Sequence, residues 1–213
     1  MKKAALHNLG CKVNAYETEA MQHLLEEAGY EIVPFTQKAD VYVINTCSVT
    51  NMADRKSRQM LHKAKKNNPD SIVVAAGCYV QTSEKEVLND LSVDIVIGND
   101  RKHDLVRLLE EYYLDSVNDT VDDINDGKHD FEELFIDQTK EHTRAFIKVQ
   151  DGCNQFCSYC IIPYARGRVR SRRFENVIAE VERLAANGFK EVVLTGIHLS
   201  SYGVDFEEAT GLL

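Results

Sequence analysis

The chain has 213 residues, of which 44% are hydrophobic and 28% are charged, as in a globular protein with a core of its own. Its formal charge is −9, but eight acids and one base fall within residues 115–133, whereas residues 134–213 carry ten of each sign. No apolar run approaches the roughly 20 residues of a membrane span, and the first eight residues lack the apolar part of a secretory signal. We therefore expect no contact with a membrane and a cytoplasmic location.

The first half of the chain predicts strands that alternate with helices. Strands are expected at 4–9, 31–35, 41–45, 72–76 and 93–97, and helices at 15–28, 50–67, 82–91 and 101–113. The strand segments are apolar on both faces, which is typical of a parallel sheet covered by helices on both sides. Residues 1–114 are therefore predicted to form an α/β domain.

The rest of the chain divides into an acidic segment and a second unit. Residues 115–143 hold the excess acids and little apolar material, which predicts a solvated linker. Residues 144–213 predict a strand at 145–150, a helix at 174–187 and a strand at 191–196. These three elements form one βαβ unit, followed by a tail.

Six cysteines in a chain without an export signal indicate a role other than disulfides. Cys11, Cys47 and Cys78, here called the strand-end trio, each lie within one or two residues of the end of a predicted strand. Because parallel strands share one carboxyl edge, we expect these thiols to converge and to form a ligand set. The alternative is three inert cysteines in the core.

Cys153, Cys157 and Cys160, here called the loop trio, form a C-x3-C-x2-C pattern directly after a predicted strand. Thiolates select zinc, copper(I) or iron–sulfur clusters. Structural zinc takes four ligands, and His142 or His198 could serve as the fourth, although neither has a placement that favours it. A [4Fe–4S] cluster held by three thiolates keeps one iron open. We favour a catalytic cluster, and a zinc site or a purely structural cluster stays open as an alternative.

These motifs resemble a known family. Residues 152–167, GCNQFCSYCIIPYARG, are similar to the signature of the radical S-adenosylmethionine (SAM) enzymes, and more specifically of their methylthiotransferases. The sequences LGCKVN at 9–14, NTCSVT at 45–50 and GCYVQ at 77–81 resemble the three cysteine motifs in the amino-terminal domain of that family. LGCKVN and LTGIHLSSYG at 194–203 most resemble the branch that acts on N6-threonylcarbamoyladenosine at position 37 of tRNA.

The resemblance implies the fold class. It is α/β, with an amino-terminal parallel-sheet methylthiotransferase domain over 1–114, the acidic linker over 115–143, and the start of a radical SAM (β/α) partial barrel over 144–213. A full (β/α)8 barrel takes about 250 residues, and only 70 follow position 143. The chain is therefore expected to be an amino-terminal fragment with a truncated radical SAM core.

The resemblance also implies cofactors and chemistry. The loop trio would hold a [4Fe–4S] cluster that generates a radical from SAM, and the strand-end trio a second [4Fe–4S] cluster that carries the sulfur. The radical would remove hydrogen from C2 of the adenine, and a second SAM would supply the methyl group. Tyr159 would lie near the adenine of SAM. Gly196 falls where many radical SAM enzymes bind the methionine amino group, although Thr195-Gly196-Ile197 departs from their Gly-Gly-Glu pattern. An electron donor such as flavodoxin or ferredoxin would reduce the cluster.

Basic residues suggest a nucleic-acid partner. Five arginines crowd the segment after the loop trio: Arg166, Arg168, Arg170, Arg172 and Arg173. Their planar guanidinium groups suit phosphate, which favours contact with the anticodon loop of a tRNA, where an unstacked base is accessible. The alternative is a solvated basic loop. A second group on the helix at 50–67 is interpreted as an ordinary solvated face: Arg55, Lys56, Arg58, Lys63, Lys65 and Lys66.

Other functions stay open at this point. The substrate could instead be isopentenyladenosine in tRNA or a ribosomal protein. A non-catalytic iron–sulfur protein for electron transfer or oxygen sensing would not consume SAM. A zinc-stabilised RNA-binding module would be colourless and insensitive to air.

Overall fold

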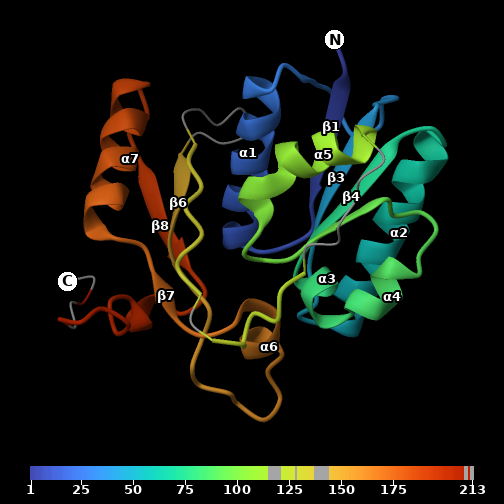
Figure 1. Ribbon diagram of the computed structural model, residues 1–213. Coiled ribbons are helices and arrows are strands. Elements are labelled where there is room, and N and C mark those ends of the chain that lie inside the picture. Colours follow the sequence, from blue (N-terminus) through green and yellow to red (C-terminus); the bar gives the residue numbers. More distant parts are fainter. Residues whose placement is uncertain (115–120, 128, 137–143, 209–210, 212–213) are drawn as a thin grey trace.

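The computed structural model describes residues 1–114, 121–127, 129–136, 144–208 and 211, and it contains two sheets (Figure 1). The larger sheet has five parallel strands in the order β2-β1-β3-β4-β5. Its strands are β1 (Lys3–Asn8), β2 (Glu31–Ile32), β3 (Val41–Thr46), β4 (Ile72–Gly77) and β5 (Ile95–Ile97). This is a doubly wound order, in which the chain reverses direction across the sheet between β1 and β3.

Helices cover both faces of this sheet, as the sequence predicted. On one face lie α1 (Lys12–Glu27) and α5 (Leu105–Tyr113), the latter preceded by the 3₁₀ turn η1 (Lys102–Asp104). On the other face lie α2 (Asn51–Asn67), α3 (Cys78–Thr82) and α4 (Glu84–Leu88). All residues of β3 and β4 are buried, which explains why both strands are apolar except for Asn45 and Thr46 at the end of β3.

The smaller sheet has the order β7-β6-β8. β6 (Ala145–Asp151) pairs in parallel with β8 (Val192–Gly196) and antiparallel with β7 (Arg170–Ser171). Helix α7 (Phe174–Ala186) connects them and packs on β6, so the predicted βαβ unit is confirmed. Two further short elements are α6 (Ile162–Arg166) and the 3₁₀ turn η2 (Leu199–Ser201).

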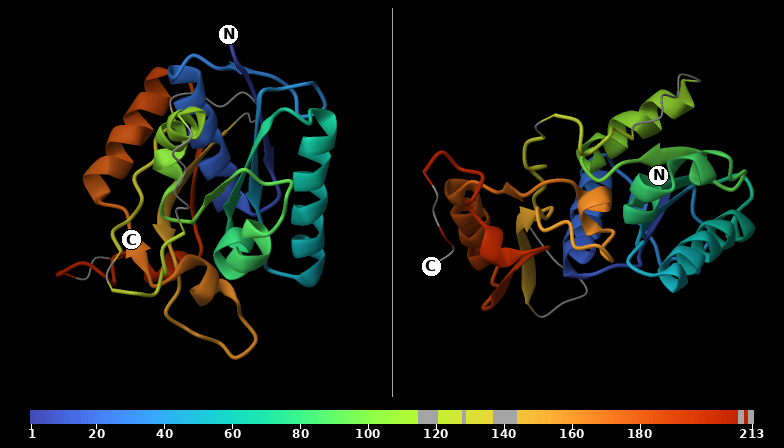
Figure 2. Two further views of the ribbon diagram at one scale, coloured as in Figure 1. Left: turned by 45° about the vertical axis from the view of Figure 1, so that its right-hand side comes forward. Right: turned by 90° about the horizontal axis from the view of Figure 1, so that it is seen from below.

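Helix α1 joins the two sheets (Figure 2). Met21 and Leu25 are buried against the larger sheet. Tyr16 and Ala20 are buried in a separate cluster with β6 and α7. Because α1 buries side chains toward both sheets, it fixes the edge of the larger sheet relative to β6.

Three sequence predictions need correction. The helix expected at 82–91 is two short helices, α3 and α4, which meet at Ser83. The strand expected at 31–35 has only two residues. The linker is not simply solvated, because Ile124, Leu134 and Ile136 are buried. The remaining linker residues, 115–120, 128 and 137–143, lie outside the described residues.

Among the described helices, none combines the length and the hydropathy that crossing a membrane requires.

Candidate functional site

The strand-end trio lies at the carboxyl edge of three neighbouring strands. Cys11 follows β1 and directly precedes α1, Cys47 follows β3 directly, and Cys78 follows β4 as the first residue of α3. Since β1, β3 and β4 are adjacent and parallel, the three thiols share one edge of the sheet, as the sequence predicted. This edge includes the reversal between β1 and β3, which is where doubly wound sheets bind ligands.

The three thiols are close enough to influence one another electrostatically. Burial raises the pKa of the Cys47 thiol, a backbone hydrogen bond at Val49 opposes this rise, and negative charge on Cys78 and Cys11 adds to it. Cys11 is exposed, Cys47 is half-buried and Cys78 is buried, so the trio runs from the surface inward.

Two asparagines contact thiols of this trio. Cys11 Sγ donates to Asn14 Oδ1 over 3.4 Å, and Asn99 Nδ2 donates to Cys78 Sγ over 3.6 Å. Asn14 is fixed in turn, because its Nδ2 donates to Asn45 Oδ1 and to the carbonyl oxygen of Thr46. The thiols therefore sit in a polar, hydrogen-bonded setting rather than in an inert apolar core.

The loop trio follows β6. Cys153 is buried, Cys160 is half-buried and Cys157 is exposed. The Cys153 N–H donates to the carbonyl oxygen of Gly167 over 3.0 Å, and the Cys160 N–H donates to that of Cys157 over 2.9 Å. Between them Phe156 takes a positive φ of 45°, a conformation that is uncommon for a residue other than glycine. The loop is thus tightly constrained at both ends.

Each trio offers three thiols as ligands. Within the described residues, no three side chains of His, Cys, Asp or Glu come together as ligands of one metal ion. Three thiols and no fourth in each group suit a cluster with one open iron.

The two SAM-binding candidates lie in the second unit. Tyr159 sits within the cysteine loop and is 90% exposed. Gly196 ends β8, and a Cβ there would come within 2.9 Å of Gln150 Oε1. Gln150 Oε1 also accepts from the His198 N–H over 2.7 Å, so it fixes the turn after Gly196. Their roles toward SAM stay predictions.

Three of the five arginines assigned to RNA are buried, and for them that prediction is wrong. The Arg172 guanidinium bonds to Glu180, and its Nε donates to Glu133 Oε2 over 2.9 Å. Arg170 donates to the carbonyl oxygen of Arg166 over 2.9 Å, and Arg166 itself is 1% exposed. Carboxylates and carbonyls of the protein therefore bind the guanidinium groups of Arg166 and Arg172, whereas Nε and Nη1 of Arg170 are buried without a hydrogen-bond partner in the described residues. Arg168 and Arg173 are exposed.

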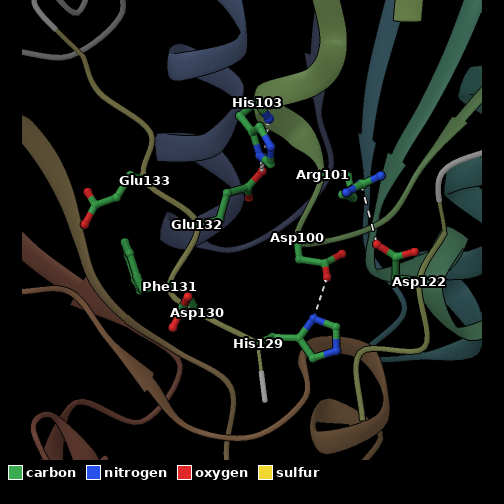
Figure 3. Close-up of a pocket in the computed structure, with 9 residues that line it drawn as sticks. All are labelled: Asp100, Arg101, His103, Asp122, His129, Asp130, Phe131, Glu132 and Glu133. Carbon is green, nitrogen blue, oxygen red and sulfur yellow. Dashed lines mark hydrogen bonds and ion pairs between the residues drawn. The ribbon is translucent and has the colours of Figure 1, made fainter. Parts of the chain in front are cut away.

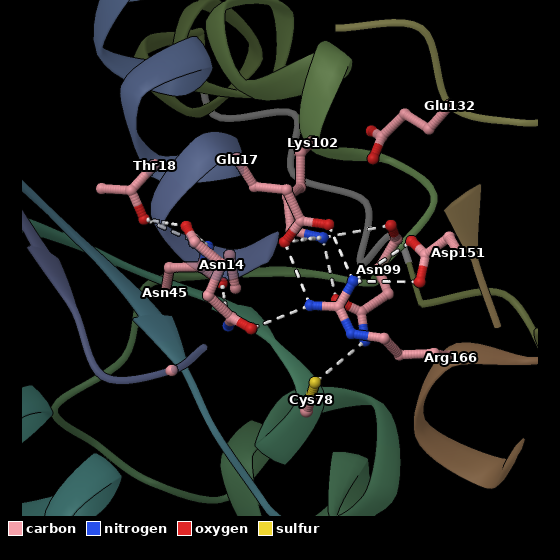
Figure 4. A network of polar contacts seen from close by, with 12 residues as sticks. Asn14, Glu17, Thr18, Asn45, Cys78, Asn99, Lys102, Glu132, Asp151 and Arg166 are labelled. Carbon is pink, nitrogen blue, oxygen red and sulfur yellow. Dashed lines mark hydrogen bonds and ion pairs between the residues drawn. The ribbon is translucent and has the colours of Figure 1, made fainter. Parts of the chain in front are cut away.

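The sequence analysis missed a cluster of buried charges around Arg166 (Figure 4). Glu17 of α1 and Asp151 of β6 lie here with three cations, namely Lys102, Lys148 and Arg166. One signal was available: Lys148 stands within the otherwise apolar segment 145–149, and a charge in a buried strand indicates a buried partner. The identity of that partner, Glu17, was not visible in the pattern.

An acidic cavity of about 440 Å³ lies between the linker and η1 (Figure 3). Its carboxylates are partly paired within the cavity: His129 Nδ1 lies 2.9 Å from Asp100 Oδ2, and His103 Nδ1 lies 3.2 Å from Glu132 Oε1. The hydrogen bond to Glu132 raises the pKa of His103, and burial opposes this rise.

Two family profiles match the chain. The one described as "Uncharacterized protein family UPF0004" matches residues 3–98, and the one described as "Radical SAM superfamily" matches residues 147–210. The first match spans the larger sheet with the strand-end trio, and the second begins within β6 and includes the loop trio.

Curated relatives combine both parts. The chain is 47% identical over 210 residues to the threonylcarbamoyladenosine tRNA methylthiotransferase MtaB of Bacillus subtilis (98% of this chain, 46% of the relative), and 46% identical over 205 residues to MtaB of Aquifex aeolicus (95% and 50%). It is 36% identical over 217 residues to the tRNA-2-methylthio-N(6)-dimethylallyladenosine synthase of Bacillus subtilis (98% and 42%). The chain thus spans about half the length of the curated relatives it matches.

A solved structure shares the fold at low sequence identity. The radical SAM methyltransferase TsrM from Kitasatospora setae, with cobalamin and a [4Fe–4S] cluster bound, aligns with a TM-score of 0.62 and 15% identity over 93% of this chain and 48% of that one. This likeness supports the fold alone.

Proposed function

Since this chain belongs to the radical SAM methylthiotransferases, we propose that it holds two [4Fe–4S] clusters and SAM as part of an enzyme that modifies tRNA. The enzyme adds a methylthio group to C2 of N6-threonylcarbamoyladenosine at position 37. The observation that carries the proposal is the presence of two separate three-thiol sets, one at the carboxyl edge of the larger sheet and one in the loop after β6.

The chain's own residues hold and shield the reacting groups. The cofactors supply radical chemistry that removes hydrogen from an unactivated carbon, which acid–base groups cannot do. The loop trio would hold one cluster directly after β6, and Tyr159 and Gly196 lie at the same end of β6 and β8, where they would contact SAM. Cys153 and Cys78 are buried, so these two thiols would bind iron away from water.

The substrate assignment follows the relatives. Those named for threonylcarbamoyladenosine share 40–47% identity with this chain, whereas those named for dimethylallyladenosine share 35–36%. This difference favours the threonylcarbamoyl branch over isopentenyladenosine (dimethylallyladenosine) in tRNA.

Contact with tRNA falls to exposed basic residues. Arg168 lies between the buried Arg166 and Arg170, with its guanidinium 4.3 Å from the centre of the Phe156 ring, and Arg173 directly follows the buried Arg172. Both are exposed beside the loop trio and are the candidates for phosphate of the anticodon stem and loop. A reductant such as flavodoxin or ferredoxin supplies electrons, and the reaction takes place in the cytoplasm.

Iron analysis tests the proposal directly. After anaerobic reconstitution, the chain is expected to bind about eight iron and eight sulfide, and about four of each in either the Cys11/Cys47/Cys78→Ala or the Cys153/Cys157/Cys160→Ala variant. Cleavage of SAM under dithionite should vanish only in the second variant. Two results would contradict two independent clusters: the chain binds zinc instead of iron, or it binds only four iron and both triple variants lose all of them. Two clusters without SAM cleavage would instead favour an electron-transfer protein.

Mass spectrometry of tRNA tests the substrate. The whole protein should add sulfur and methyl to tRNA that carries threonylcarbamoyladenosine, and not to the same tRNA isolated from cells unable to form that modification. Equal or preferred modification of dimethylallyl tRNA would overturn the assignment.

A further inference from the structure

Arg166 occupies the centre of the buried charge cluster. Its Nη1 lies 2.8 Å from Glu17 Oε1 and 3.1 Å from Asp151 Oδ2. Lys148 contacts the same two carboxylates, at 3.0 Å and 3.3 Å, and Lys102 lies 3.3 Å from Glu17 Oε2. All five side chains are at most 2% exposed. Two further buried groups belong to the cluster: Arg170 Nη2 lies 3.8 Å from Asp151 Oδ2, and the Glu132 carboxylate, 2% exposed, attracts Lys148. Four cations therefore face three carboxylates, which leaves one buried positive charge in excess.

The cluster reaches the strand-end trio through two asparagines (Figure 4). Asn14 Oδ1 accepts from Arg166 Nη2 over 2.9 Å and from Cys11 Sγ over 3.4 Å. Asn99 Nδ2 contacts Cys78 Sγ and also donates to the carbonyl oxygen of Ala165 over 2.6 Å. Each asparagine thus connects a cysteine of the strand-end trio to helix α6.

The same helix is tied to the loop trio. α6 begins two residues after Cys160 and ends at Arg166, and the carbonyl oxygen of the next residue, Gly167, accepts from the Cys153 N–H. α6 also packs against α3, whose first residue is Cys78. One short helix therefore touches both cysteine groups, and its only charged side chain is Arg166.

We propose that Arg166 is a positioning residue that couples the two trios. It holds the loop trio against α1, and its positive charge offsets the negative charge of the thiolates in the strand-end trio. The role extends the proposed function, because it assumes that the strand-end trio carries a cluster.

The charge balance supports this role. A buried charge without a counter-charge is costly, so the excess cation requires a negative partner nearby. Burial lowers the pKa of Arg166, but attraction to Asp151 and to the Cys78 thiolate, together with Glu17, raises it well above its ordinary value. A cluster bound by three thiolates supplies such a negative partner, and it becomes more negative on reduction. A cation held beside it therefore favours the reduced form.

A redox titration measures the charge effect. In the Cys153/Cys157/Cys160→Ala background only the strand-end trio can hold a cluster, whose midpoint potential is followed by absorption and electron paramagnetic resonance. Arg166→Gln should lower the potential and Glu17→Gln should raise it, since they remove charges of opposite sign. Arg166→Lys, which keeps the charge, should restore most of the potential. Arg107→Gln removes an exposed arginine of α5 that pairs with Asp104 and Glu111, and it should cause no shift.

The stability of the metal-free protein tests the docking role, namely that Arg166 holds the loop trio against α1. Arg166→Gln and Glu17→Gln, alone and together, are compared by their unfolding midpoints in guanidinium chloride. Each single variant breaks the ion pair between Arg166 and Glu17, and the second substitution has no such pair left to break, so the double variant should be less destabilised than the sum of the two.

The outcomes separate the possibilities. Arg166→Gln with full iron and an unchanged potential overturns the charge role, and so does a shift of the same sign in Arg166→Gln and Glu17→Gln. Strictly additive midpoints overturn the docking role. If the Cys153/Cys157/Cys160→Ala variant binds no iron, the proposed function fails together with the charge role of Arg166. The unfolding midpoints still test whether Arg166 holds the loop trio against α1.

Discussion

At the scale of single residues, the backbone around Gly152 explains why glycine precedes a cysteine of the loop trio. Gly152 has a φ of +70°, a region that side chains other than glycine rarely adopt. A Cβ there would also collide with the carbonyl oxygen of Arg168. The strand and the returning segment can approach this closely only because position 152 has no side chain. Cys153 is thereby placed beside Gly167.

We expect Gly152→Ala to unfold at a lower temperature than the parent and to lose the iron of the loop trio while retaining that of the strand-end trio. Gly188→Ala is a matched control, because Gly188 also has a positive φ of 93° but no atom within 4 Å of its virtual Cβ. A smaller loss of stability in Gly188→Ala than in Gly152→Ala would show the cost of the collision with Arg168, because both variants share the strain of a positive φ. Equal loss in both variants, with full iron in each, would contradict the close-approach argument.

The arginines show what a local pattern cannot predict. The segment 166–173 is basic and follows a cysteine loop, so it matches a phosphate-binding surface. Burial of Arg166 depends on Glu17, which lies 149 positions earlier, and burial of Arg172 depends on Glu180, which lies on α7. The packing of α1 against β6 brings Glu17 into place, whereas Glu180 is placed by α7 itself, eight residues after Arg172. Arg168, two residues from Arg166, stays exposed.

At the scale of elements, the larger sheet follows from the sequence. Its strand segments are apolar on both faces and alternate with helices, and this alone places the strand-end trio on one edge once the strands are parallel. The short elements α6 and β7 were missed, because five and two residues carry no periodicity. Both owe their position to contacts with distant segments, namely α3 for α6 and β6 for β7.

The start of α2 offers a test at this scale. The Thr50 side chain accepts from the Ala53 N–H over 3.1 Å and caps the helix that begins four residues after Cys47. Thr50→Ala should lower the free energy of unfolding by about 1 kcal/mol, as for other lost caps. Ser83→Ala is the control, since in the described structure the Ser83 side chain makes no capping bond to α4. Equal effects of the two substitutions in chemical denaturation would contradict the capping role.

At the scale of the whole molecule, polar contacts reinforce the packing of α1 between the two sheets. The Tyr16 hydroxyl donates to the carbonyl oxygen of Leu134 and lies 3.2 Å from both carboxylate oxygens of Glu180. The next residue of the same helix, Glu17, forms ion pairs with Lys148 of β6 and Arg166 of α6. Breaking either contact leaves buried polar groups unpaired, so the two sheets are expected to unfold together rather than one by one.

The buried carboxylates make this joint stability dependent on pH. Burial would raise the pKa of Asp151, but Arg166, Lys148 and Arg170 lower it to about 2. Burial would also raise the pKa of Glu17, but Arg166, Lys102 and Lys148 lower it well below its ordinary value. The unfolded chain titrates near the reference of about 3.9 for Asp and about 4.3 for Glu. Glu180 acts in the opposite direction, because burial outweighs Arg172 and raises its pKa.

A folded-state pKa below the unfolded one stabilises the fold above the unfolded pKa, and this contribution is lost as the pH falls through the folded pKa. The metal-free chain should therefore keep its unfolding midpoint from pH 6 to about pH 4 and lose stability between about pH 4 and about pH 2. Asp151→Asn should be less stable at pH 6, because it leaves Arg166 and Lys148 short of a partner, yet its midpoint should fall less steeply with acid. Denaturant midpoints of both chains at pH 6, 4, 3 and 2 measure the difference in slope. Parallel curves for the two chains would show that Asp151 is not held ionised by the buried cations, since a carboxyl with an ordinary pKa contributes no such slope.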